Sequence, residues 1–165
     1  SKGMALNVSR ITDYLLISTR LREEDLAAIR ELDVRLIVGM IAGQPPPRRL
    51  AELEIDILWL GTFDFFLLPI PLATLHRGVD AALPVIRRGH QVLVYCQAGR
   101  HRSVAMGAAI LIGMGHSADE AMELIVRQRP VADPGAWHIR RQIRRFERSW
   151  RQRQMLEEKS GNKAN

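Results

Sequence analysis

Cysteine is nearly absent from this 165-residue chain, which contains Cys96 and no other thiol. A single cysteine excludes an intramolecular disulfide, and it excludes a metal site built from several thiolates. A lone cysteine without further context is most often a small buried apolar residue. Cys96 therefore has to be judged from the residues that surround it.

Long apolar runs are also missing. The longest candidate, residues 104–115, is rich in Gly and Ala and is shorter than the roughly 18 to 20 residues that a membrane-spanning helix needs. The first residues lack the charged-then-apolar pattern of a secretory signal and resemble an artificial extension ahead of Met4. We therefore expect a cytoplasmic protein without a transmembrane segment.

Most of the chain has no excess charge, and the net charge of +6 arises near its end. Residues 1–135 contain 15 Lys and Arg against 15 Asp and Glu, whereas residues 136–165 contain 9 against 3. Residues 136–158 predict a basic C-terminal helix whose arginines could contact a polyanion, and residues 159–165 predict a disordered tail. One face of this helix is expected to pack on the body through Ile139, Ile143, Phe146 and Trp150.

Apolar segments of two kinds alternate along the body of the chain. Short runs without polar alternation are typical of strands buried on both faces of a parallel sheet. Longer runs at helical spacing predict helices that cover this sheet. We expect strands at about 15–17, 35–41, 55–60 and 91–95, and helices at about 20–32, 72–88, 103–113 and 118–127. The pattern predicts an α/β fold in a single domain over residues 4–158, with a central, mostly parallel sheet flanked by helices.

The segment Cys96-Gln-Ala-Gly-Arg-His-Arg102-Ser103 contains the residues best suited to chemistry. Five residues between Cys96 and Arg102 allow a loop whose backbone N–H groups face a tetrahedral anion, and Gly99 permits the turn. The helix that starts at Ser103 directs its positive end to the same place. These donors and Arg102 favour the reactive thiolate of Cys96, and the planar fork of Arg102 can grip two phosphate oxygens.

A Cys-x-x-Gly-x-x-Arg-Ser loop between a buried strand and a helix resembles the signature loop of the protein tyrosine and dual-specificity phosphatases. The resemblance covers most of the chain, because residues 14–18 resemble the start of this fold and residues 126–130 resemble the stretch that closes its site from below. The late cysteine, the preceding acid and the short chain fit the compact dual-specificity group best. The resemblance implies a protein tyrosine phosphatase-like fold.

The resemblance also implies a role for each residue of the loop. Cys96 is expected to be the nucleophile, Arg102 the phosphate clamp, and Ser103 the donor of a hydrogen bond to the leaving thiolate. The remaining substrate-binding residues are expected to be Gln97, Ala98, Gly99, Arg100 and His101. Because loop donors stabilise the phosphoryl transition state, we expect no metal and no other cofactor.

A general acid is expected upstream of the cysteine, on a mobile loop. Similar sequences carry it at the position of Asp64, just after a predicted strand and 32 residues before Cys96. Its neighbours Phe63, Phe65 and Phe66 are expected to desolvate the carboxyl group and to raise its pKa. A simple turn-capping role for Asp64 stays open, and Asp56 is a competing candidate although it lies inside the predicted strand.

Two further positions leave alternatives open. Tyr95 stands where the resembling family usually has His, which leaves the pH optimum open. His101 could donate to a second anionic group or face solvent. The other histidines show no metal-ligand spacing, and we interpret them as surface or cap residues; they are His76, His90, His116 and His138.

The expected function is hydrolysis of phosphotyrosine and phosphoserine or phosphothreonine in proteins through a cysteinyl-phosphate intermediate. Arg100, His101 and the basic helix suggest an alternative, the same chemistry on a polyanion such as a phosphoinositide or an RNA 5′ phosphate. A third alternative is a phosphate-binding module without catalysis. Cys96 and Asp64 argue against it, because binding alone needs neither a nucleophile nor an acid.

Overall fold

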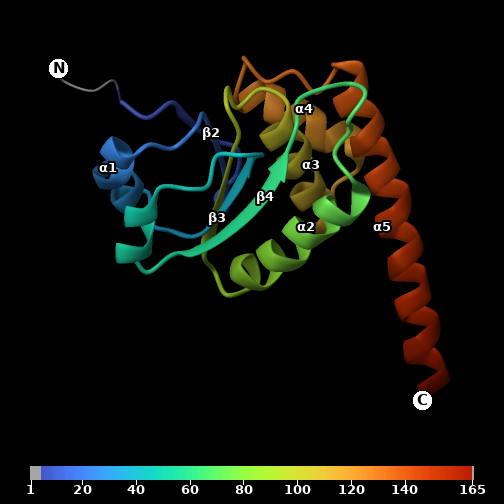
Figure 1. Cartoon of the computed structure of the whole chain (residues 1–165). Coiled ribbons are helices and arrows are strands. Elements are labelled where there is room, and N and C mark those ends of the chain that lie inside the picture. Colours follow the sequence, from blue (N-terminus) through green and yellow to red (C-terminus); the bar gives the residue numbers. More distant parts are fainter. Residues whose placement is uncertain (1–4, 165) are drawn as a thin grey trace.

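A five-stranded sheet forms the centre of the computed structural model, which describes residues 5–164 (Figure 1). Met4, the expected start of the domain, and Asn165, the last residue of the expected tail, lie outside this range. In spatial order the strands are β1 (Val8–Arg10), β2 (Leu15–Ser18), β5 (Gln91–Tyr95), β3 (Val34–Ile41) and β4 (Asp56–Thr62). All neighbouring strands run parallel except β1, which pairs antiparallel with β2. The prediction of a mostly parallel sheet is confirmed.

The three middle strands are buried on both faces, as their unbroken apolar sequences predict. In β3 and β5, Ile37 pairs with Leu93 and Val38 pairs with Val94, and all four side chains are inaccessible to solvent. The edge strand β1 was not predicted, since three half-exposed residues give no periodic signal.

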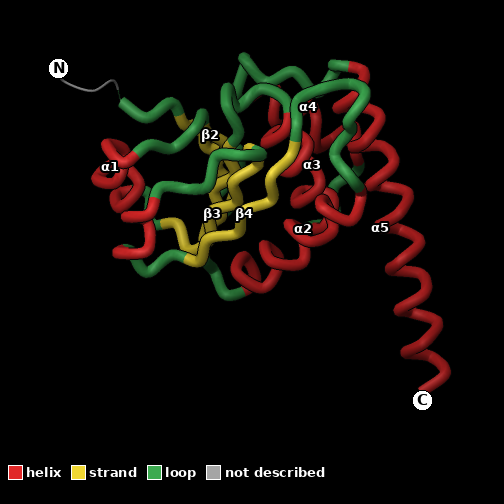
Figure 2. The backbone as a smooth tube through the Cα atoms, viewed as in Figure 1, coloured by secondary structure: helices red, strands yellow, loops and turns green. Residues whose placement is uncertain are grey.

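Helices cover both faces of the sheet unequally (Figures 1 and 2). On one face α2 (Leu72–Arg87) and α3 (Arg102–Gly113) pack against the strands, and α4 (Ala118–Gln128) and α5 (Trp137–Ala164) pack outside α3. The short α1 (Leu26–Glu31) lies on the other side. Helix α3 is buried from Arg102 to Ile112, which fits its apolar sequence and makes it the rigid support of the loop before it.

Helix α5 packs through the predicted stripe, because Ile139, Ile143, Phe146 and Trp150 are all buried. Its last turns project away from the rest of the molecule (Figure 1). Residues 159–164, which we expected to be a disordered tail, continue this helix. No proline interrupts the segment, and the pair between Arg153 and Glu157 supports it at i,i+4 spacing. Across residues 5–164, no helix has both the length and the apolar character needed to cross a bilayer.

Candidate active site

The loop from Cys96 to Arg102 joins the carboxyl end of β5 to the start of α3. Gly99 adopts a φ of 62°, the left-handed region that favours glycine. A Cβ at this position would lie 2.6 Å from Nη2 of Arg129 and 2.7 Å from the carbonyl oxygen of Ser18. Both the backbone angle and the close neighbours therefore require glycine at position 99.

Cys96 is buried at the floor of this loop, with 2% of its surface exposed. Its Sγ lies 3.1 Å from Oγ of Ser103, which is itself buried. A hydroxyl can donate a hydrogen bond to a thiolate, so this contact fits stabilisation of the charged sulfur. The predicted roles of Cys96 and Ser103 thus have a matching contact.

Arg102 is held in place by the backbone of two strands. Its Nη1 donates to the carbonyl oxygens of Thr62, at 2.9 Å, and Met40, at 3.3 Å. Its Nε is buried and has no hydrogen-bond partner within residues 5–164. A buried donor without an acceptor is costly, and an anion bound in the loop would supply the missing acceptor.

Asp64 follows β4 by two residues and lies against the Cys96 loop. One carboxylate oxygen is 2.8 Å from Nδ1 of His101, and the other is 2.8 Å from Nε2 of His138. Asp64 therefore joins three segments that are distant in sequence: its own loop, the Cys96 loop and the first turn of α5. The competing Asp56 lies at the opposite end of β4, roughly 20 Å of strand away from this edge.

The prediction of a raised pKa for Asp64 was wrong. Burial by itself would raise this pKa, but the hydrogen bonds from His138 and His101 outweigh it, and the pKa of Asp64 lies below its ordinary value. The three phenylalanines expected to desolvate the carboxyl group are themselves 45% to 57% exposed. The neighbours of Asp64 in the chain are thus largely exposed, while its hydrogen-bond partners come from remote parts of the chain.

His101 links two carboxylates, because its Nε2 also lies 3.2 Å from Oδ2 of Asp133. Both ring nitrogens can donate only when the ring carries its second proton. His101 is thus engaged by two carboxylates of the chain itself, and its contribution to substrate binding stays a prediction. The interpretation of His138 as a surface or cap residue was also wrong, since it contacts Asp64 and is only 17% exposed. The separation of 74 residues between His138 and Asp64 gives no signal in the sequence.

Arg129 supports the Cys96 loop from below and was not predicted as a site residue. Its side chain is buried and donates to the carbonyl oxygens of Gly99, at 2.7 Å, and Ala98, at 3.3 Å. The other end of the fork reaches Asn7 Oδ1 at 2.9 Å and Ser9 Oγ at 3.0 Å. Burial lowers the pKa of Arg129, and negative charge at Cys96 opposes that shift. The resemblance of residues 126–130 was the signal available for this residue.

The remaining predicted loop residues lie at the rim. Gln97, Ala98 and Arg100 are exposed, and Nη2 of Arg100 lies 3.6 Å from Asp133. Their contribution to substrate binding stays a prediction. Tyr95, just before the cysteine, is buried over Gly39, and burial raises its pKa to about 12. Tyr95 is therefore neutral at physiological pH.

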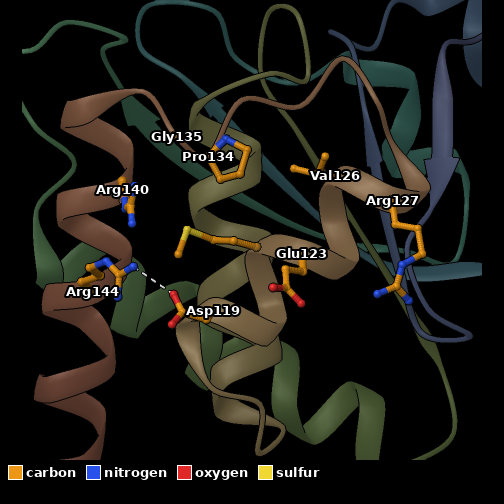
Figure 3. Close-up of a pocket in the computed structure, with 9 residues that line it drawn as sticks. Asp119, Glu123, Val126, Arg127, Pro134, Gly135, Arg140 and Arg144 are labelled. Atoms are coloured by element: carbon orange, nitrogen blue, oxygen red, sulfur yellow. Dashed lines mark hydrogen bonds and ion pairs between the residues drawn. The ribbon is translucent and has the colours of Figure 1, made fainter.

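A groove of about 580 Å³ lies between α4 and α5, lined by both acidic and basic side chains (Figure 3). In this groove Arg144 points toward Asp119 and pairs with it at 2.9 Å. Glu123 and Arg127 line the same groove. The inner edge of the basic helix therefore faces mixed charge, which a polyanion would not favour.

Comparison with known proteins agrees with this geometry. No family model matches the chain. Mouse dual specificity phosphatase 28 is 33% identical over 121 residues, which cover 70% of this chain and 69% of that protein. Rat phosphatidylglycerophosphatase and protein-tyrosine phosphatase 1 is 45% identical over 76 residues, which cover 46% of this chain and 39% of that protein. The crystal structure of PTPMT1 in complex with PI(5)P has a TM-score of 0.79 at 25% identity, over 88% of this chain and 97% of that chain.

The chain belongs to the dual-specificity phosphatases, within the protein tyrosine phosphatase superfamily. It is a phosphatase with the fold that the sequence predicted.

Proposed function

We propose that Cys96 is the nucleophile of a phosphomonoester hydrolase and that Asp64 is its general acid. The thiolate attacks phosphorus in line, the bond to the leaving oxygen breaks, and Asp64 donates a proton to that oxygen. Water then attacks the cysteinyl-phosphate, Asp64 accepts a proton from it, and the thiolate is released beside Ser103. The observation that carries this proposal is that one loop joins Cys96, whose Sγ contacts Ser103, to Arg102, whose buried Nε has no hydrogen-bond partner in the described part of the chain.

Phosphorylated protein is the substrate class that we propose, with hydrolysis of both phosphotyrosine and phosphoserine or phosphothreonine. Relatives named as dual-specificity phosphatases support this class. A reactive thiolate survives best where thiols are kept reduced, which supports a cytoplasmic location. The proposed steps use only side chains of the protein and water, and none of them requires a metal ion.

The test compares two variants on substrates that differ in leaving group. Cys96→Ser should reduce turnover to below a hundredth of wild type and still bind vanadate, because the loop donors and Arg102 remain. Asp64→Asn should lower the rate roughly 100-fold or more on a phosphopeptide and less on nitrophenyl phosphate, since general acid catalysis contributes about 10² to 10⁴. Turnover that survives Cys96→Ser would contradict the role of Cys96 as nucleophile. If Asp56→Asn, rather than Asp64→Asn, lowers the rate more on the phosphopeptide than on nitrophenyl phosphate, the role of Asp64 as general acid is wrong.

A second candidate substrate is a phosphoinositide at a membrane surface. Five apolar side chains that follow β4 are 45% to 66% exposed beside Asp64; they are Phe63, Phe65, Phe66, Leu67 and Leu68. We call them the apolar loop. A loop of this kind can insert its side chains among lipid acyl chains and bring a headgroup phosphate to the site. A similar protein, PTPMT1, has been solved with PI(5)P.

If the apolar loop inserts into a membrane, substitutions in it should affect hydrolysis of lipid in vesicles but not hydrolysis of soluble lipid. Phe66→Ser with Leu67→Ser should lower the hydrolysis of PI(5)P in vesicles at least about 10-fold, because two apolar anchors are removed. Hydrolysis of a short-chain, soluble PI(5)P should not change. Leu156→Ser, which changes an equally exposed leucine on the projecting end of α5, is the control. Equal losses on both forms of the lipid would exclude membrane insertion.

A further inference from the structure

Asp64, His101 and His138 form a three-residue cluster that could hold a metal ion. One potential ligand atom from each residue lies within 4.8 Å of the other two. Two imidazoles and one carboxylate form a ligand set that zinc accepts in sites that keep a fourth position open. The side chains are 36%, 20% and 17% exposed in the same order, so an ion could reach them from solvent.

We propose that this cluster is a zinc-binding site and that bound zinc inhibits the enzyme by taking Asp64 as a ligand. A carboxylate bound to zinc cannot carry the proton that the leaving oxygen needs. The inhibitory part rests on the proposed role of Asp64 as general acid, whereas the binding part does not.

The geometry of the cluster needs only a small adjustment to accept the ion. Tetrahedral zinc with bonds of about 2.0–2.1 Å places its ligand atoms about 3.4 Å apart. Each Asp64 oxygen is 2.8 Å from its histidine nitrogen, and all three potential ligand atoms lie within 4.8 Å of one another. Shifts of about 1 Å, within reach of side-chain rotation, would bring the atoms to the distances of a zinc site.

Asp133 gives the cluster the outer partner that zinc sites commonly have. A histidine that binds zinc through one nitrogen usually donates its other N–H to a carboxylate or carbonyl. His101 presents Nδ1 to Asp64 and Nε2 to Asp133, and Arg100 lies 3.6 Å from the same Asp133 oxygen. With zinc on Nδ1, the Nε2–H would still donate to Asp133.

The single cysteine makes the binding test decisive, because a thiolate is the other strong zinc ligand in the chain. In Cys96→Ser no thiol remains, and zinc titration by calorimetry should still detect one ion per chain. Cobalt in its place should give the intense visible absorption of a tetrahedral site. Magnesium should not compete, since it prefers oxygen ligands. Absence of zinc binding in this inactive variant would overturn the site, whatever the enzyme hydrolyses.

A second variant identifies the ligands. His138→Gln can keep an N–H donor for Asp64 but lacks the imidazole lone pair, so in the Cys96→Ser background it should weaken zinc binding roughly 100-fold or more. His90→Gln changes a histidine after α2, outside the cluster, and should bind zinc like its parent. Equal affinity in the two histidine variants would show that the cluster is not the binding site.

Inhibition is measured separately on enzyme that retains Cys96. His138→Gln should require at least about 10-fold more zinc for half-inhibition than wild type, and His90→Gln the same concentration as wild type. If His138→Gln does not change the zinc sensitivity, inhibition occurs at the Cys96 thiolate and the regulatory role of the cluster is wrong.

Discussion

Two imidazoles hold the carboxyl group of Asp64 and favour its ionised form. His138 and His101 lower the pKa of Asp64, although burial alone would raise it. A general acid must be protonated when the substrate binds, so activity falls on the alkaline side as Asp64 loses its proton. A lowered pKa moves this fall to lower pH. The same hydrogen bonds hold the carboxyl group against the loop, but by lowering its pKa they also reduce the fraction of Asp64 that is protonated at neutral pH.

His138→Leu removes one of these donors and should raise the pKa of Asp64. The alkaline limb of kcat/KM against pH should therefore move to higher pH. His138→Gln, which keeps an N–H at a similar position, should move the limb less. The profile is measured on nitrophenyl phosphate without added metal. An alkaline limb that stays in place in His138→Leu would mean that another group controls it.

Tyr95 offers a second test at the level of one residue. It is neutral at physiological pH, because burial raises its pKa to about 12. Tyr95→His places a ring that can be charged next to Cys96, which favours the thiolate. The pH dependence of iodoacetate inactivation should shift to lower pH. Tyr95→Phe, which removes only the hydroxyl group, should keep the wild-type profile, and an unchanged profile in both variants would exclude a role for this position.

At the scale of elements, the Cys96 loop depends on Arg129 as much as on its own residues. Arg129 donates to two loop carbonyls and to two side chains near β1, and all of these bonds come from one buried guanidinium. It thus connects the segment after α4 to the loop and to the N-terminal strand. The loop conformation is therefore a property of three elements.

Methionine fills a volume similar to that of arginine but donates no hydrogen bonds. Arg129→Met should therefore remove the bonds that hold the carbonyl groups of the Cys96 loop. Each buried acceptor left without a partner costs about 1–3 kcal/mol, so the free energy of unfolding in urea should fall by at least that amount. Vanadate binding should weaken as well. Arg129→Lys keeps the positive charge but not the planar fork of donors. It should therefore still lose most of the unfolding free energy that Arg129 contributes. Full stability in Arg129→Lys would show that charge, rather than the fork, supports the loop.

The sequence predicted the Cys96 loop well because its constraints lie in consecutive residues. The strand, Gly99, Arg102 and the following helix restrict one another over a short stretch. The surroundings of Asp64 could not be predicted, since His101 and His138 are 37 and 74 residues away. The predicted direction of the pKa shift of Asp64 was wrong for the same reason. Only the fold decides that the phenylalanines face solvent.

For the whole molecule, the basic excess of the C-terminal helix is less available than its composition suggests. Arg144 pairs with Asp119, Arg151 with Glu147, and Arg153 with Asp80. Three exposed arginines of α5 have neither an ion pair nor a side-chain hydrogen bond within residues 5–164, whereas the exposed Arg145 donates to Gln142; the three are Arg140, Arg141 and Arg148. The first two lie within one turn of His138, so they are placed to attract a polyanion to the site.

If these arginines attract an anionic surface, replacing all three by Gln should raise the KM for PI(5)P vesicles several-fold and leave nitrophenyl phosphate turnover intact. The wild-type rate on vesicles should fall steeply between about 50 and 200 mM salt, because exposed charges are screened over about 10 Å at 0.1 M. The salt dependence should be weaker in the triple variant, which has fewer charges to screen.

A matched triple variant separates a local from a general effect of charge. Arg30→Gln, Arg35→Gln and Arg87→Gln remove the same charge from exposed positions on other elements. Both triple variants reduce the net charge of +6 equally, so attraction by overall charge would change their KM values alike. Attraction by the face beside Asp64 would change only the α5 variant. If neither variant changes the KM on vesicles, α5 has a structural role alone, and phosphoprotein is favoured as the substrate.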